Sequence, residues 1–226
     1  TTTTLRSTGK LFVPVSNPPA STTVASGTFE SIGNPYASAI DFLNITKSAA
    51  PAVDDVFYVW DPLLPGTYNL GGFQTISSSN GYKPNPGGTA NYSSAAAYTK
   101  IQSGQAFMVH STSGIGTVSF SESAKLAGSN MVYRQLNQQA QPITITPDES
   151  NNNTGRQFLR VQLFTNDGKM ADANVVAFDQ QFSNDYESND ALKIAHVGEN
   201  FDISSNGKLL SVEARAKVSR TDTIRY

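Results

Sequence analysis

Alternation between apolar and polar positions runs through most of the chain wherever a pattern can be read. In residues 116–121, Val118 and Phe120 fall on one side while Thr117 and Ser119 fall on the other. A period of two is typical of a strand with one buried face. Similar alternation covers residues 156–164, through Leu159, Val161 and Leu163, and residues 208–218, and it predicts two further strands.

One segment departs from this pattern because it is apolar on both sides. Residues 55–60, "DVFYVW", carry large apolar side chains at consecutive positions. Such a run predicts a central strand that is covered on each face. We expect Trp60, the only tryptophan, to lie in the core with the rest of this strand.

Turn-forming residues separate the predicted strands. The pairs Asp167-Gly168 and Asn206-Gly207 are the kind that tolerate the positive φ angles of type I′ hairpins. Each pair therefore predicts two adjacent antiparallel strands. Helical periodicity is weak, and the fold class that follows is all-β, with antiparallel strands arranged as a jelly-roll-like β-sandwich.

The amide-rich stretch between the two halves of the chain, with two prolines and a run of asparagines, predicts a domain boundary. We expect a β-sandwich module over residues 1–140, a linker or long connection over 141–155, and a second module over 156–226. A sandwich of this style usually needs about seven strands. The second module is too short for that number, so the sequence predicts that it is incomplete.

The segment 31–45, "SIGNPYASAIDFLNI", combines a turn with an apolar run. Gly33-Asn34-Pro35 forms the turn, because a proline biases the residue before it away from helical geometry. We expect Ile40 and Phe42 to point inward after the turn. Asp41 is then an acceptor for backbone N–H groups at a bend, and not an acid catalyst.

Composition narrows the range of functions. The 226 residues include no cysteine, and 16 Lys and Arg balance 18 Asp and Glu to a net charge of -2. This balance gives no basic surface for nucleic acid. No apolar run approaches the ~20 residues that cross a bilayer. The polar residues are mostly Thr, Ser, Asn, Gln and Gly, a bias that resembles extracellular β proteins, so we expect an extracellular or cell-surface location.

The candidate catalytic residues give little support for an enzymatic activity. His110 and His196 lie outside any nucleophile or zinc motif. The carboxylates of Asp54, Asp55 and Asp61 sit at ordinary turn positions, where they bond to the local backbone. We therefore expect a protein that is not an enzyme.

An acidic stretch near residue 185 raises the question of calcium. Residues 178–194 offer carboxylate and amide oxygens, foremost Asp179, Asp185 and Asp190. Ca²⁺ takes six to eight such ligands. The stretch lacks the EF-hand pattern, and this favours a solvated connection whose Asn and Asp side chains bond to the local chain. Calcium is thus the one cofactor hypothesis, and otherwise we expect none.

Aromatic residues in the Gly- and Ser-rich loops suggest a second candidate function. These residues can reach solvent and provide flat faces for sugar rings; they are Tyr68, Phe73, Tyr82, Tyr92 and Tyr98, with Tyr68, Tyr82 and Tyr92 as the candidate binding residues. Loop aromatics also serve as lids over the ends of sandwiches. Carbohydrate binding through these tyrosines is therefore an alternative function.

Two long segments resemble a known family. The first is "GTFESIGNPYASAIDFLNI" with "VFYVWDP" and "IQSGQAFMVHSTSGIGTVSFSESAK", and the second includes "LRVQLFTNDGKMADANVVAFDQQFSNDYESNDALKI". The first resembles a β module of large secreted and cell-surface proteins of the Bacteroidetes. Many of these proteins are cargo of type IX secretion and end in a sorting domain. The second segment resembles the module that usually comes next in such proteins.

The resemblance implies a non-catalytic segment that acts as a structural scaffold or an adhesion segment. It implies that the partners are other domains of the same polypeptide, and surface glycans or proteins, without nucleic acid or membrane insertion. In such bacteria an Asp-Thr-aliphatic triplet can accept an O-linked glycan, and Asp222-Thr223-Ile224 fits, so Thr223 is a candidate acceptor.

Overall fold

A computed structural model describes residues 12–13, 21–48, 53–64, 66–87, 98–127 and 155–226. Its strands are β1 (Ser21–Val24), β2 (Phe29–Gly33), β3 (Ile40–Asp41), β4 (Thr46–Lys47), β5 (Val56–Asp61), β6 (Gly72–Ser77), β7 (Lys100–Ile101), β8 (Ala106–His110), β9 (Gly116–Ser119), β10 (Gln157–Phe164), β11 (Met170–Phe178), β12 (Ala191–Leu192), β13 (Ile203–Ser205) and β14 (Lys208–Arg215). Short 3-10 turns are η1 (Phe42–Asn44), η2 (Ser78–Asn80) and η4 (Glu122–Ala124). The fold is all-β, as predicted.

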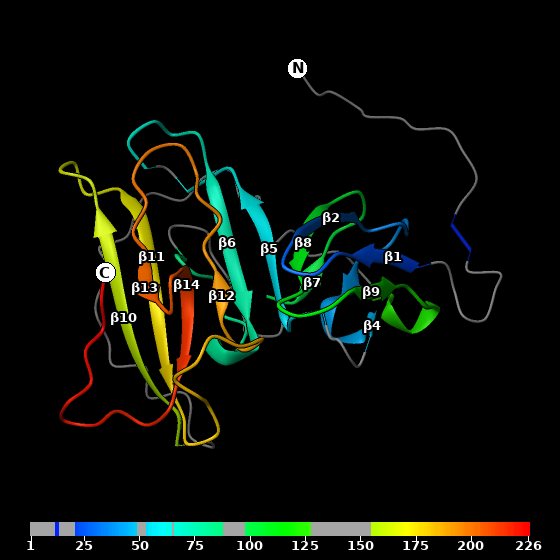
Figure 1. Cartoon of the computed structure of the whole chain (residues 1–226). Coiled ribbons are helices and arrows are strands. Elements are labelled where there is room, and N and C mark those ends of the chain that lie inside the picture. Colours follow the sequence, from blue (N-terminus) through cyan, green and yellow to red (C-terminus); the bar gives the residue numbers. More distant parts are fainter. Residues whose placement is uncertain (1–11, 14–20, 49–52, 65, 88–97, 128–154) are drawn as a thin grey trace.

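The strands form layers (Figure 1). A central sheet has the order β2-β8-β5-β6, and a larger sheet has the order β10-β11-β14-β12, with β13 paired to β14. On the opposite side of the central sheet lie the small sheets β1-β9-β4 and β3-β7. This packing of sheets is consistent with a β-sandwich.

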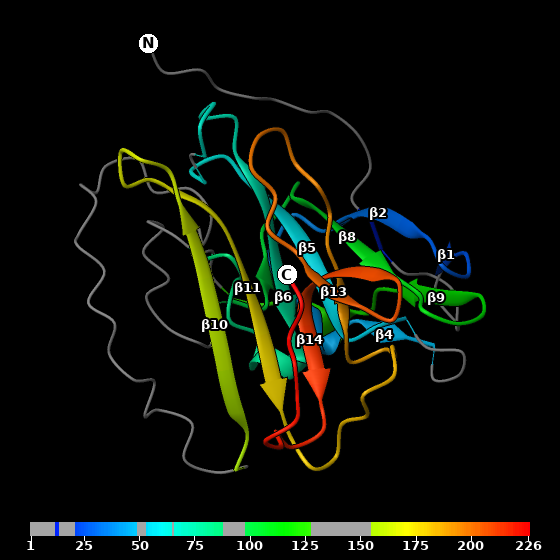
Figure 2. The same ribbon diagram turned by 60° about the vertical axis from the view of Figure 1, so that its left-hand side comes forward.

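Buried side chains join the central sheet to the larger sheet. Val56 and Tyr58 of β5 pack against Val175 of β11, Ala191 of β12 and Val212 of β14. Partly buried residues extend this cluster, namely Phe29, Phe73, Met108, Phe158 and Ile194. The two sheets therefore face each other over a shared core, and the turned view shows β10, β11 and β14 lying over β5 and β6 (Figure 2).

The other face of the central sheet covers a second core. Phe42, Phe57 and Phe107 meet there with ring centroids 4.3 to 6.3 Å apart. Ile40 and Phe42 are both fully buried, so the predicted inward positions are confirmed. Asp41 caps η1, because its carboxylate accepts the Leu43 N–H at 3.1 Å, and this confirms its predicted structural role.

Asn34 explains why the turn before β3 is well defined. Its side chain is 6% exposed, and its Nδ2 donates to the carbonyls of Ser38, Ile101 and Gln102 at 2.9 to 3.2 Å. Its Oδ1 accepts the Tyr36 N–H at 2.9 Å. The predicted turn is thus held from both sides by one buried amide.

The two predicted hairpins are present, but their turns differ. Asn206 and Gly207 both have positive φ, as a type I′ turn between β13 and β14 requires. Between β10 and β11 only Gly168 has positive φ, and the pairing shifts register next to Phe164. This connection is therefore a longer loop with a bulge and not a type I′ turn, but it joins two adjacent antiparallel strands, as predicted.

One strand pair departs from the predicted antiparallel arrangement. β11 and β14 run parallel, with Val175 opposite Val212. A parallel pair needs a long crossover connection, and residues 179–207 between the two strands provide it.

Two expectations about side-chain positions also need correction. Trp60 is 44% exposed and not in the core, because it lies near the end of β5 beside Phe73, at a ring distance of 5.2 Å. In β10, Leu159 is 40% exposed, whereas Phe158 on the opposite face packs into the core between the sheets. The polar face of β10 is thus the one turned toward the central sheet.

The predicted linker, residues 141–155, lies outside the described residues except for Gly155. The regions on either side of it are in direct contact. Arg156 donates to the carbonyls of Ser78 and Ser79 at 3.2 Å, and the Ser79 hydroxyl donates to the Asn189 carbonyl at 2.5 Å. The division into two modules stays a prediction, and the two regions share one core.

Candidate functional site

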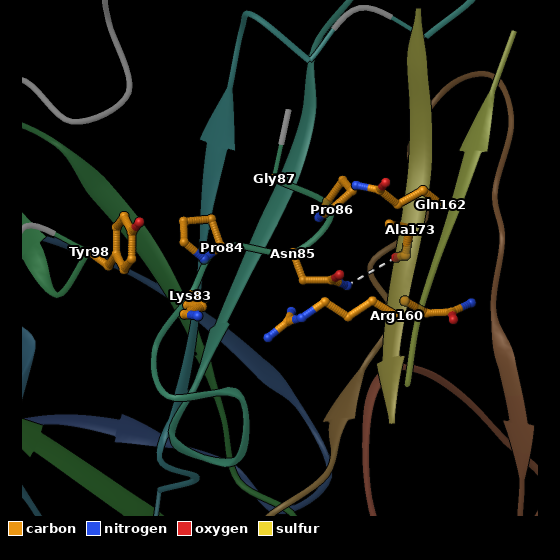
Figure 3. Close-up of a pocket in the computed structure, with 10 residues that line it drawn as sticks. Lys83, Pro84, Asn85, Pro86, Gly87, Tyr98, Arg160, Gln162 and Ala173 are labelled. Carbon is orange, nitrogen blue, oxygen red and sulfur yellow. Dashed lines mark hydrogen bonds between the residues drawn. The ribbon is translucent and has the colours of Figure 1, made fainter. Parts of the chain in front are cut away.

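A pocket of about 260 Å³ opens between the two facing sheets (Figure 3). One wall is the segment 83–87 after β6, together with Tyr98. The other wall is formed by β10 and β11. The lining residues are Lys83, Pro84, Asn85, Pro86, Gly87, Tyr98, Arg160, Gln162, Ala173 and Asn174.

Asn85 fixes the first wall to the larger sheet. It is 2% exposed, and its Nδ2 donates to the carbonyls of Ala173 and Ser211 and to the Ser211 hydroxyl at 2.9 to 3.1 Å. Its backbone pairs with that of Thr75 in both directions, at 2.7 and 3.0 Å. The wall is therefore attached to both sheets.

Gln74 of β6 holds the end of the same wall. Its amide accepts the Gly87 N–H at 2.8 Å and donates to the Gly87 carbonyl at 2.6 Å. The same Nε2 also donates to Asp61 at 2.9 Å. Because Gln74 is fully buried, these bonds are shielded from water and the wall is held in place.

The second wall owes its polar character to the orientation of β10. Arg160 and Gln162 alternate with the apolar positions of the strand and lie on the same face as Phe158. Figure 3 shows the Arg160 side chain extending toward the Lys83 and Pro84 side of the pocket. The pocket is therefore lined by two cationic side chains, amides, prolines and one aromatic ring.

Asn174 is a further polar residue at this place, but its side chain belongs to the other face of β11. Its register partner is Val161, one position away from the Gln162 and Ala173 pair that lines the pocket. The side chain is fully buried, and among the residues that the structure describes neither of its polar atoms has a hydrogen-bond partner. It contributes to the pocket through its place in the strand and not through its amide.

Two of the three predicted ligand-binding tyrosines, Tyr68 and Tyr82, are described by the structure, and their surroundings differ. Tyr68 is 61% exposed in the connection between β5 and β6. Tyr82 packs against the core beneath the central sheet, and its hydroxyl donates to Asp55. Burial, followed by this bond, raises the pKa of Tyr82 well above its usual range. Tyr92 lies outside the described residues, and Tyr98 is the loop tyrosine that lines the pocket.

The three carboxylates of the calcium hypothesis have separate surroundings. Asp179 pairs with Arg156 at 3.2 Å and accepts the Gln181 N–H, and these bonds lower its pKa. Asp185 is exposed. Asp190 is 3% exposed and accepts the N–H groups of Glu187 and Ala214, both at 2.8 Å. Within the described ranges no three His, Asp or Glu side chains are placed to hold a metal ion.

The two histidines have carboxylate neighbours. His110 Nδ1 lies 2.6 Å from Asp54, which also accepts the backbone N–H and hydroxyl of Thr112. His196 lies 3.9 Å from Asp172. Neither ring has a hydrogen bond to a hydroxyl group in the part of the chain that the structure describes. The Asp54 carboxylate joins His110 to the loop at Thr112.

The candidate O-glycosylation acceptor is accessible. Thr223 is exposed, while its neighbour Ile224 packs against a small buried cluster with Ile203 and Leu210.

Within the described ranges no helix is long and apolar enough to cross a membrane.

Comparison with known families gives one match. A family model described as "Domain of unknown function (DUF8693)" matches residues 3–225. The chain belongs to this family. No curated protein and no solved structure matches it.

Sequence reasoning missed most of the pocket of this DUF8693 chain. The segment 83–87 reads as an ordinary turn-rich connection, and Arg160 and Gln162 read as the solvent face of a strand. Two prolines that flank Asn85 are a local sign of a fixed backbone. No local pattern, however, links that segment to β10, which lies more than seventy positions later.

Proposed function

We propose that this DUF8693 chain is a non-catalytic module of a larger secreted or cell-surface protein, and that it serves adhesion by binding carbohydrate. The observation that carries the proposal is the preformed polar pocket between segment 83–87 and β10. Ligand sites are typically concave, with apolar walls and a few fixed polar groups. The pocket is concave and offers such polar groups, although its walls are more polar than those of a typical ligand site.

The lining residues suit a sugar. Tyr98, Pro84 and Pro86 offer apolar faces to the C–H side of a ring. Gln162 offers an amide that can both donate to and accept from hydroxyl groups. The volume of about 260 Å³ is just below the range of about 300 to 1,000 Å³ typical of drug-sized ligands. A single ring, and not a long chain, therefore fits the enclosed part.

The non-catalytic part of the proposal rests on the surroundings of the acidic and basic groups. The buried Asp54 and His110 pair bonds to the backbone and side chain of Thr112, as a structural network does. The secreted location rests on the uncharged polar composition and on the resemblance to modules of Bacteroidetes surface proteins. A role as a scaffold between neighbouring domains is compatible with the same features.

A glycan array followed by calorimetry on the hits tests carbohydrate binding. The matched variants are Tyr98→Ala, which removes the ring in the pocket, and Tyr68→Ala, which removes an exposed ring outside the pocket lining. We expect Tyr98→Ala to weaken binding at least tenfold and Tyr68→Ala to leave it unchanged. The opposite result would place the binding site at Tyr68 and not in the pocket. An array without hits would refute carbohydrate binding.

A further inference from the structure

A group of charged residues is buried at the start of β11, outside the pocket lining. The side chains of Asp172, Lys193 and His196 are 0%, 5% and 4% exposed. Lys193 Nζ donates to Asp172 Oδ1, and His196 Nε2 lies 3.9 Å from the same oxygen. A buried ion pair gives up the hydration of both charges, and an apolar pair in its place is often at least as stable. Stability alone therefore does not explain why this amine and this carboxyl group are buried together.

Two backbone groups fix the Asp172 carboxyl group beside the amine. Its Oδ2 accepts the Phe201 N–H at 2.7 Å, and its Oδ1 accepts the Ala173 N–H at 2.8 Å. If the Lys193 nitrogen adds to the carboxyl carbon, negative charge develops on Oδ2, where the Phe201 N–H already points. Preorganised N–H donors stabilise such an oxyanion, and two groups held in contact react as if they were at a very high concentration.

Asp202 is the neighbouring group that can carry a proton between them. It directly follows Phe201, and its Oδ1 is buried without a hydrogen-bond partner among the residues that the structure describes. Burial raises the pKa of Asp202; Lys193 and His196 oppose the rise, and Asp172 adds to it. An amine must lose a proton to become a nucleophile, and a carboxyl oxygen must gain one to leave. A buried carboxyl group next to both residues can do both.

We propose that Lys193 and Asp172 condense to an intramolecular amide, which links the segment after β12 covalently to β11, and that Asp202 carries the proton. This modification does not depend on the proposed carbohydrate binding. Buried amine and carboxyl groups that are placed in contact, with an N–H donor and a proton carrier beside them, are the components that such a condensation needs.

The condensation balances without an oxidant or a reductant. Burial opposes ionisation of Asp172, but His196, Lys193 and the Phe201 N–H together lower its pKa, so the reaction begins from an ion pair. Because burial disfavours both charged forms, a proton can pass from the ammonium group to the carboxylate. The Nζ–Cγ bond then forms and the Cγ–Oδ1 bond breaks. Oδ1 leaves as water with two protons, both of which come from the ammonium group, and Asp202 gives and regains one proton on the way.

The mass of the denatured protein tests the proposal directly. We expect the chain, after it has been kept folded overnight at neutral pH, to be lighter than its sequence mass by one water molecule. Trypsin should then leave the bond after Lys193 uncut, because that side chain has lost its charge. It should release residues 170–208 as one peptide, which also lacks one water. A folded chain that has its full sequence mass and is cut after Lys193 would overturn the inference.

Variants of the lysine assign the loss of water to this pair. Lys193→Arg keeps the positive charge beside Asp172 but removes the reactive amine, and Lys193→Met removes both. Each should fold, as measured by circular dichroism, and keep its full mass. The matched control is Lys169→Arg, since Lys169 pairs with Asp167 at 3.0 Å in an exposed place. This control should still be lighter by one water, and a folded Lys193→Arg that also lacks one water would contradict the assignment.

Asp202→Asn tests the proton carrier. The fraction of linked chains, followed by mass after cell-free synthesis, should rise more slowly by at least about tenfold, because a positioned acid–base group contributes a factor of that size or more. An unchanged rate would overturn the role of Asp202. A lost water that maps outside residues 170–208, as in a cyclic imide at Asp167-Gly168, would instead show ordinary dehydration of the chain and overturn the cross-link.

Discussion

Asn34 uses its whole side-chain amide to hold one turn. Alanine at this position removes the donor shared by three carbonyls and the acceptor of the Tyr36 N–H. Because Asn34 is buried, water replaces these partners poorly, and we expect Asn34→Ala to lower the free energy of unfolding by about 2–4 kcal/mol. Urea denaturation measures the loss.

The exposed Asn44 provides the control for this substitution. Asn44→Ala should change the free energy of unfolding by less than about 0.5 kcal/mol. Equal losses in the two variants would mean that the hydrogen bonds of Asn34 contribute nothing specific to the turn.

Asp190 gives the fold a dependence on pH. Burial raises the pKa of its carboxyl group to about 7, and Glu213 and Glu187 add to the rise, while its two backbone N–H donors oppose it. In the unfolded chain the pKa is about 3.9. The folded state therefore keeps a proton that the unfolded state releases. The stabilisation from this proton is complete below about pH 4 and is lost as the pH rises through 7.

We expect Asp190→Asn to flatten the pH profile of stability. The gap between the two pKa values corresponds to about 4 kcal/mol at most, so a loss of about 2–4 kcal/mol between pH 4 and pH 7 should disappear in the variant. Thermal denaturation across that range measures it. Asp185→Asn, at an exposed position, should keep the original slope. An unchanged slope in Asp190→Asn would show that the carboxyl group is ionised in the folded state.

At the scale of elements, segment 83–87 depends on Asn85 for its attachment to the larger sheet. We expect Asn85→Ala to lower the free energy of unfolding by about 2–4 kcal/mol, because it leaves the Ala173 and Ser211 carbonyls without this donor in a buried place. The same variant should weaken ligand binding in the pocket, since it loosens one wall. Chemical denaturation and calorimetry give the two values.

Asn166→Ala, at an exposed loop position, is the matched control for Asn85→Ala and should change neither quantity. Full stability in Asn85→Ala would mean that the paired backbone of Thr75 and the bonds of Gln74 hold the wall without the side chain of Asn85.

The strands themselves could be predicted from the sequence, because alternation and turn residues are local signals. Val118 and Phe120 are buried as predicted, and β5 is covered on both faces over most of its length. The predictions that failed are those that depend on which distant segments cover a side chain. Trp60 follows four buried residues in β5, yet it lies where the facing sheet no longer covers it. No local pattern contains that information.

The pocket could not be predicted from the sequence either, because it also depends on contacts between distant segments. Arg160 and Gln162 occupy the polar side of an alternating strand, which normally faces solvent. β10 is the edge strand of its sheet, and its polar side faces segment 83–87. The turn at Asn34 and the cap at Asp41 could be predicted, since their partners include residues only a few positions away.

At the scale of the whole molecule, the shared core determines how the chain folds. Val56 and Tyr58 come from the first region, whereas Val175 and Val212 come from the second. Separation of the regions would expose apolar surface on both, at a cost of about 25 cal/mol per Å². The match of one family model to residues 3–225 is consistent with a single evolutionary unit.

We therefore expect one cooperative unfolding transition for the full chain. Val175→Ala, which removes contacts between the regions, should lower the free energy of unfolding by about 2 kcal/mol and shift the whole transition, because both regions lose the same packing. Calorimetry compares the measured heat of unfolding with the value calculated for a two-state process. The isolated fragment 156–226 should lack fixed structure alone and regain it when mixed with fragment 1–140. Two separate transitions, with Val175→Ala shifting only one of them, would instead support independent modules joined by the residues around 141–155.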